Sequence, residues 1–259
     1  MPLQMFNIQF ALPAFAMVLF RVGGLVISSP LIGSQAVSSQ LKVAFSFVVS
    51  LMIFPIVWTR LPVTLHWPEL VPIVFGELVI GLIIGLAVEL IFLGVQMAGM
   101  MIGQQAGIAL GEVINPMLDG QTTIIGQVFY LVTLMVFLLI GGHRTMIAVL
   151  LDTFESIPPG SFQVSTSIVT LFQDLLTATF ILGLRLAAPA ITALFIASLA
   201  MGFIARTIPQ LNILTIGFAL RIFVGLTVAA FSLSLAFDLL YDGILDGFDL
   251  LGPVMGIRP

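Results

Sequence analysis

The alternation of long apolar stretches with short polar connections constrains this chain more than any other feature of its sequence. Six stretches approach or exceed the length of about 20 mostly apolar residues that a membrane-spanning helix needs. They cover residues 10–32, 43–58, 71–98, 124–140, 175–201 and 213–237. We therefore expect an all-α fold of about six long apolar helices, arranged in helical hairpins of the kind found in membrane proteins.

The composition supports this fold class and excludes several functions. Of the 259 residues, 60% are hydrophobic and only 8% are charged, whereas a soluble domain carries about a quarter charged residues. Eight Lys or Arg residues and a net charge of −4 leave no concentrated basic surface for nucleic acid. The chain has no cysteine, which excludes disulfides and thiol catalysis. We expect one unit over residues 1–259, embedded in a membrane or among equally apolar partners.

Signals for catalysis are weak. His66 and His143 lie in separate connections and lack metal-ligand spacing. Neither a P-loop nor a Gly-x-Ser-x-Gly nucleophile motif occurs in the sequence. We therefore expect a protein that is not an enzyme and that uses no metal and no cofactor.

The most unusual segment separates the third apolar stretch from the fourth. Glycines recur there every fourth residue and are followed by polar residues and a proline; the candidate residues are Gly103, Gln104, Gly107, Gly111, Glu112, Asn115, Pro116 and Asp119. Glycines on one helix face admit a neighbouring backbone, so close helix packing is one interpretation. Because glycine and proline also disfavour a helix, we favour an irregular, mobile loop over about residues 103–121.

Three methionines lie beside this loop in the sequence. Met97, Met100 and Met101 are candidates for a deformable gasket, because methionine adapts to variable shapes; ordinary core packing is the alternative.

Five charged residues lie inside apolar stretches: Arg21, Glu77, Glu89, Arg185 and Arg221. Charged residues in such stretches usually pair or face water. We favour buried salt bridges between helices or subunits over an ion relay, and the sequence does not name the pairs.

A second polar break separates the last two apolar stretches. It crowds several capping or helix-breaking residues into one turn, namely Arg206, Pro209, Gln210 and Asn212. This pattern predicts a tight helical-hairpin turn rather than a binding site.

Two motifs together resemble the FliR/SctT family of export-gate subunits of flagellar and virulence type III secretion systems. They are IGQQAG…NPMLDG…IGQ over residues 102–127 and ARTIPQLNI over residues 205–213, and the resemblance covers essentially the whole chain. It implies a single copy in a helical assembly with several FliP and FliQ homologues, at the bacterial inner membrane in the flagellar basal body, lifted toward the periplasm. It also implies a FliP-like part over residues 1–170 and a FliQ-like hairpin over residues 171–259.

The same resemblance implies roles for the two motifs. The glycine-rich residues match a plug loop that projects into an export channel, and the residues around Pro209 match the hairpin turn. Implied partners are FliP, FliQ, an FlhB-like switch protein and unfolded export substrates. This sequence has Asn115 before Pro116 where the family often carries aspartate, which leaves the plug boundaries open.

Two alternatives to a flagellar gate remain. The first is the virulence injectisome homologue of the same family. The second is a secondary transporter with a binding site at the membrane midplane, since such sites also use broken helices with Gly and Pro. A transporter predicts an inverted repeat between the two halves of the chain, and we find none in the sequence.

Overall fold

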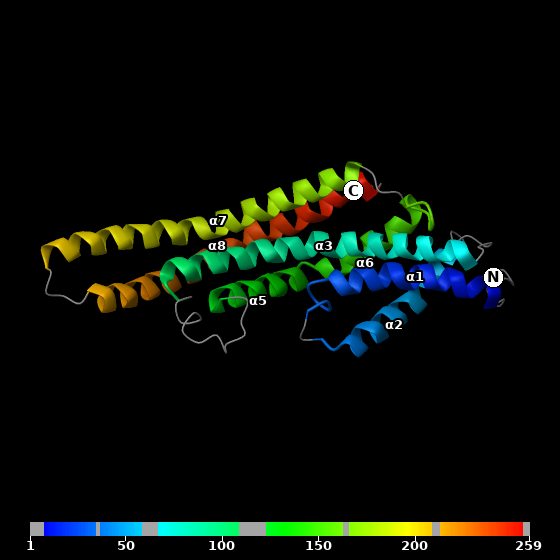
Figure 1. Cartoon of the computed structure of the whole chain (residues 1–259), viewed down its shortest axis with the longest axis horizontal. Helices are drawn as coiled ribbons and strands as arrows, with labels where there is room; N and C mark the ends of the chain where they lie inside the picture. The colour runs from blue at the N-terminus through cyan, green and yellow to red at the C-terminus, as the bar shows by residue number, and fades with distance from the viewer. Residues whose placement is uncertain are drawn as a thin grey trace. The chain divides into compact units, whose positions relative to one another are not determined.

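The computed structural model describes residues 8–34, 37–58, 67–108, 123–162, 166–208 and 213–255. Within these ranges the regular structure is entirely helical (Figure 1): α1 (Ile8–Ser28), α2 (Ser39–Val57), α3 (Trp67–Ala106), α5 (Ile124–Leu139), α6 (Gly142–Ser156), α7 (Thr166–Thr207) and α8 (Ile213–Met255). In this described part, five helices are long and apolar enough to cross a membrane, or six if α5 and α6 form one broken span. The predicted all-α class is confirmed.

Each of the six predicted apolar stretches becomes a helix, but two boundaries are corrected. Residues 142–156, which we expected in a polar connection, form α6, because Met146, Val149, Leu150 and Phe154 make a buried stripe at helical spacing. The residues after the last predicted apolar stretch, which ends at residue 237, are also helical, since α8 continues to Met255.

A third correction concerns the predicted irregular loop. The expectation of a loop from residue 103 onward is wrong at its start, because α3 remains helical through Ala106. Gly99 and Gly103 lie inside this helix, where their missing side chains admit a neighbouring helix. Tertiary packing there offsets the intrinsic cost of glycine in a helix.

The contacts divide the chain into two compact units. The first comprises Met1–Leu90, Gly141–Leu175 and Ile244–Pro259, and the second comprises Ile91–Ile140 and Leu176–Gly243. Because α3, α7 and α8 each contribute to both units, the units do not follow one another along the sequence.

In the first unit, α1 packs against α2 and α3 (Figure 1). The ring of Phe15 meets those of Phe47 and Phe54 edge-on, with centroids 5.5 and 5.6 Å apart. On the other side of α1, a Cβ at Gly24 or Gly81 would collide with backbone atoms of the opposite helix. Helices α1 and α3 are therefore in direct backbone contact, the arrangement that small residues permit in membrane proteins.

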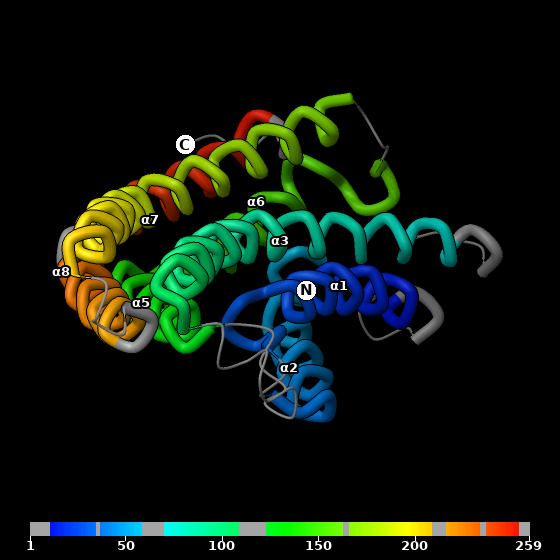
Figure 2. The backbone as a smooth tube through the Cα atoms, turned by 60° about the vertical axis from the view of Figure 1, so that its left-hand side comes forward, coloured from blue at the N-terminus to red at the C-terminus, as the bar shows by residue number. Residues whose placement is uncertain are grey.

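In the second unit, α7 and α8 run side by side as an antiparallel hairpin, as both views show (Figure 2). Ser232 Oγ donates a hydrogen bond of 2.9 Å to the carbonyl oxygen of Leu186, and Gly225 faces the side chain of Leu194. Helix α7 also meets α3 closely, because a Cβ at Gly183 would lie 2.6 Å from the carbonyl oxygen of Gly94. Glycine thus sets the close approach of α7 to α3.

Candidate functional site

The glycine-rich segment begins where α3 ends in a defined cap. Gly107 has a φ of 82°, and its amide donates to the carbonyl oxygen of Gln104 at 3.1 Å. The amide of Ile108 donates to the carbonyl oxygen of Gly103 at 3.0 Å. These are the two hydrogen bonds of a Schellman motif, which usually places glycine at the left-handed position. The candidates Gly103 and Gln104 therefore belong to the last turn of α3, and Gly107 ends it.

The segment ends at Thr123, which caps α5. The hydroxyl of Thr123 accepts a hydrogen bond of 3.1 Å from the amide of Gly126 and donates one of 3.3 Å to the carbonyl oxygen of Gly99 on α3. The threonine is buried. Its single hydroxyl both caps the N-terminus of α5 and links α5 to α3. The sequence analysis missed this residue, although a threonine directly before an apolar helix is a recognised N-cap signal.

Helices α3 and α5 touch along a seam of four residues, Gly99, Gly103, Thr123 and Gly126, which we call the α3–α5 seam. A Cβ at Gly99 would collide with the backbone of Gly126, and one at Gly103 would lie 3.1 Å from the methyl carbon of Thr123. The described residues on either side of residues 109–122 are thus held together.

Several predicted site residues lie outside the described residues. They are Gly111, Glu112, Asn115, Pro116 and Asp119 in the glycine-rich segment, and Pro209, Gln210 and Asn212 in the turn between α7 and α8. Arg206 is described and is exposed in the last turn of α7.

The gasket candidates are half-buried residues of α3. The methyl group of Met97 lies against Gly183 of α7, and Met100 lies against Gly126 of α5. Met101 is also half-buried. In the second unit, the contacts of Met97 and Met100 are those of helix packing.

Two of the charges predicted within apolar stretches form a buried ion pair. Arg21 Nε lies 2.6 Å from Glu77 Oε2, and both side chains are completely buried. The guanidinium also donates to the hydroxyl of Thr153 at 3.2 Å and to the carbonyl oxygen of Ile157 at 3.1 Å. It stacks 4.1 Å from the ring centroid of Phe154. Arg21 therefore joins α1, α3 and α6 in one place.

The second oxygen of the carboxylate completes this network. Glu77 Oε1 accepts a hydrogen bond of 3.1 Å from the amide of Gly160, which has a φ of 86°. Since buried ions are stable only when paired and hydrogen-bonded, the network fixes the loop after α6 against α3. We call Arg21, Glu77, Thr153 and Gly160 the Arg21 node. The sequence analysis named its two charges but neither Thr153 nor Gly160.

The other three charges behave differently. Arg185 and Arg221 are exposed, so they are not buried within this chain, and their pairing with neighbouring subunits stays a prediction. The face of α7 that packs on α3 and α8 contains Gly183, Leu186 and Ala187. Arg185 lies beside this face and not on it. Glu89 is half-buried, and its Oε2 has no hydrogen-bond partner among the described residues.

Comparison with known proteins places these features in a wider group. The family described as bacterial export proteins, family 1, matches residues 12–246. Flagellar biosynthetic protein FliR of Caulobacter vibrioides is 27% identical over 230 residues, which cover 88% of this chain and 92% of that relative. FliR of Escherichia coli K12 is 26% identical over 175 residues, covering 67% and 66%. FliR of Bacillus subtilis 168 is 29% identical over 146 residues, covering 56% of each chain.

Proposed function

Because this chain belongs to the bacterial export proteins, family 1, we propose that it builds, with FliP and FliQ homologues, a channel that exports unfolded flagellar proteins. Membership makes the chain a structural component of the flagellar export apparatus in the bacterial inner membrane. The observation that carries the proposal is a family match over residues 12–246, nearly the whole chain. The flagellar descriptions of the relatives favour this role over the virulence alternative.

The proposed internal organisation has two parts. Residues 1–170 form a FliP-like part, and residues 171–259 form a FliQ-like hairpin. The close pairing of α7 with α8 supports the hairpin, because Ser232, Gly225 and Gly217 of α8 each contact α7. In this organisation one chain supplies, in a single copy, equivalents of both partners.

The proposed gating element is the stretch over residues 109–122 together with its flanks. The α3–α5 seam supports this role, since it holds the end of α3 and the start of α5, which flank this stretch, against each other. A channel at rest must block ions, yet it must open when a chain is threaded through it. A side-chain-poor loop seals by packing and yields at low cost because few strong contacts hold it.

Exposed apolar surfaces support a multi-protein assembly. Large apolar side chains are exposed on α2, α7 and α8, among them Met52 at 69%, Phe203 at 74% and Phe223 at 69%. Contiguous exposed apolar surface marks contact with partners or lipid. FliP, FliQ and an FlhB-like switch protein are the proposed partners, in a gate lifted toward the periplasm, where Arg185 and Arg221 would meet neighbouring subunits.

The experiment that tests the assembly is purification of the tagged chain after co-expression with the FliP and FliQ homologues of the same genome. We expect a stable complex that contains all three proteins in mild detergent. Recovery of the chain as a functional monomer that transports a small solute would contradict the export-gate proposal and favour a transporter.

The experiment that tests the plug replaces Gly107 or Gly111 with valine in that complex. We expect altered secretion or ion leakage, because valine strongly disfavours the left-handed conformation of Gly107. Unchanged secretion together with unchanged leakage would show that these residues form no plug.

A further inference from the structure

Helix α1 of the first unit exposes a long stripe of apolar and small residues. One face of α1 packs on α2 through Phe15, and another contacts the backbone of α3 at Gly24. The remaining face carries exposed or half-buried residues three or four positions apart, namely Leu12, Ala16, Phe20, Gly23 and Ile27. At 1.5 Å per residue this stripe runs for roughly 22 Å, or about four turns. It therefore has the length and the period of a face on which a second helix packs.

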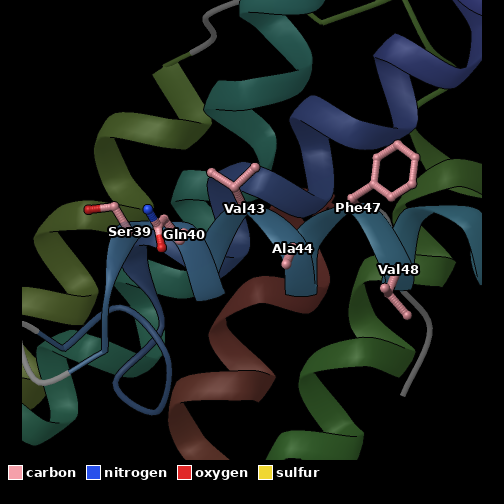
Figure 3. A pocket seen from close by; sticks show the side chains of 6 residues that line it. All are labelled: Ser39, Gln40, Val43, Ala44, Phe47 and Val48. Carbon is pink, nitrogen blue, oxygen red and sulfur yellow. The ribbon is translucent and has the colours of Figure 1, made fainter.

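A groove lies along this stripe, where α1 meets α2 and α3. It has a volume of about 340 Å³ and is open to the outside. Its walls include Phe20, Gly23 and Ile27 of the stripe, Lys42 and Val43 of α2, and Leu78 of α3; we call it the Gly23 groove. Val43 also borders a more open hollow along α2, whose lining side chains Figure 3 shows. The groove thus joins the exposed apolar stripe of α1 to the exposed apolar surface of α2.

The glycine in this groove has no explanation in the contacts among the described residues. A Cβ at the neighbouring Gly24 would collide with the backbone of α3, so that position requires glycine. A Cβ at Gly23, in contrast, would have no atom within 4 Å, although glycine disfavours a helix. Small residues in apolar helices are the points at which the backbone of another helix approaches closely. Gly23 therefore marks a crossing point for a helix that the described residues do not supply.

A positive charge lies in the same groove. Lys42 is the single lysine of the chain, and its ammonium donates a hydrogen bond of 2.8 Å to the carbonyl oxygen of Gly33. It forms no ion pair among the described residues, and two of the three donors of an ammonium remain beyond this bond. When an apolar helix covers the groove, these donors lose their contact with water. Since a buried charge is stable only when it is paired and hydrogen-bonded, the covering helix must bring an anionic acceptor.

From these observations we propose that the Gly23 groove receives a helix of a neighbouring subunit, which crosses α1 at Gly23 and pairs an Asp or Glu side chain with Lys42. This inference rests on the proposed multi-protein assembly, to which it adds a contact face and the chemistry of its occupant. The stripe fits an apolar helix, the glycine admits its backbone, and the ammonium selects a carboxylate. A helix without a carboxylate in register would leave the ammonium buried and unpaired, so Lys42 also discriminates against wrong partners.

The single lysine makes the proposed pair directly testable. A carbodiimide condenses an ammonium with a carboxylate in contact with it, and it leaves an amide bond without a spacer. The test treats membranes of cells that co-express the tagged chain with the FliP and FliQ homologues of the same genome, and peptide mass spectrometry identifies the joined residues. We expect an adduct between Lys42 and an aspartate or glutamate in an apolar helix of a partner. Lys42→Arg should lose this adduct but keep the complex, because arginine keeps the charge and its guanidinium does not react.

Further variants test the charge and the glycine separately. Lys42→Gln leaves the carboxylate of the partner buried without its cation, so recovery of the complex should fall by about tenfold or more. Gly23→Leu should lower recovery and lose the adduct, because its side chain fills the crossing point, and Gly23→Ala should have a smaller effect. Neither glycine variant should lower the stability of the chain purified alone, since a Cβ at Gly23 has no atom within 4 Å and both new residues favour a helix more than glycine.

A wild-type complex that forms without an adduct at Lys42 would overturn this inference and leave the proposed assembly intact. Unchanged recovery of the complex in both Lys42→Gln and Gly23→Leu would have the same meaning. An anionic lipid that the wild-type complex retains and Lys42→Gln loses, without an adduct to protein, would assign the groove to lipid instead. A wild-type chain that forms no complex would contradict the proposed assembly itself, and this inference with it.

Discussion

Two of the close crossings that helix α3 makes are built in different ways. At Gly81 it contacts the backbone of α1, and the Arg21 node lies one turn away with its buried, directional hydrogen bonds. At Gly99 it contacts the backbone of α5, and the hydroxyl of Thr123 is the hydrogen-bonding group of that seam. A paired ion network is costly to break, whereas a seam of backbone contacts and one hydroxyl separates at lower cost.

The comparison suggests a division of labour along α3. The Arg21 node fixes the positions of α1, α3 and α6, and the α3–α5 seam holds the flanks of residues 109–122, the proposed gating stretch. A gate needs a rigid frame and an element that moves at low cost. The Arg21 node has the strength expected of the frame, and the α3–α5 seam has the lower strength expected beside the moving element. The predictions that follow test this difference, beginning with the largest expected effect.

The Arg21 node should show the largest effect. Arg21→Met leaves Glu77 buried without its partner, so we expect a loss of about 3–5 kcal/mol in the free energy of unfolding. Titration with a denaturing detergent, followed by circular dichroism, measures this change. The double variant Arg21→Met/Glu77→Leu should recover most of the loss, because an apolar pair often replaces a buried ion pair at little cost. A double variant as unstable as the single one would contradict this account of the node.

Substitutions in the α3–α5 seam should lower the free energy of unfolding less than substitutions at the Arg21 node, and they should affect function more. Gly99→Ala places a methyl group against the backbone of Gly126, and we expect a loss of about 1–3 kcal/mol from overpacking, with increased ion leakage through the assembled complex. Gly103→Ala is the control, because its methyl group meets the side chain of Thr123 at 3.1 Å rather than backbone. If Gly99→Ala leaves leakage at the level of the wild type and of Gly103→Ala, the seam does not hold the gate.

The cap of α5 should give a smaller effect. Thr123→Val removes the hydroxyl that accepts from Gly126 and donates to Gly99, so we expect a loss of about 1 kcal/mol. Thr123→Ser keeps the hydroxyl and should stay close to the wild type. Equal stability of the serine and valine variants in the same detergent titration would mean that the hydroxyl bonds contribute nothing measurable.

The exposed arginines should give the smallest effect on the single chain. Arg185→Gln and Arg221→Gln alter exposed positions, so the expected change in the free energy of unfolding stays within about 0.5 kcal/mol. If these arginines pair with neighbouring subunits, the same variants should reduce recovery of the complex. Pull-down yields, compared with the stability of the purified chain, separate the two effects.

Hydropathy predicted most of the fold because a spanning helix is recognised by its length and its apolar composition. It missed α6, whose polar ends mask a buried stripe of Met146, Val149, Leu150 and Phe154 at spacings of three and four. It also ended the last apolar stretch at residue 237, whereas α8 continues to Met255. Asp238, Asp242 and Asp246 recur every fourth residue there and are exposed, so they form one polar face of the helix. Both helices carry a 3.6-residue period, which an apolarity count does not detect.

The candidate site was less predictable, for a physical reason. The sequence names Arg21 and Glu77 as unusual, but their pairing spans 56 residues and depends on how α1 and α3 cross. The glycines admit two interpretations that differ only in whether a neighbouring backbone is present. At Gly99 and Gly103 that neighbour is α5, so packing prevailed over the expected loop.

The most direct test of the account is the resting ion conductance of the reconstituted complex, with residues 109–122 intact or replaced by a short Gly–Ser linker. The account predicts that the shortened variant still assembles with its partners and conducts ions in the absence of export substrate, while the intact complex stays closed. A shortened variant that assembles normally and conducts no more than the intact complex would contradict the claim that this stretch closes the channel.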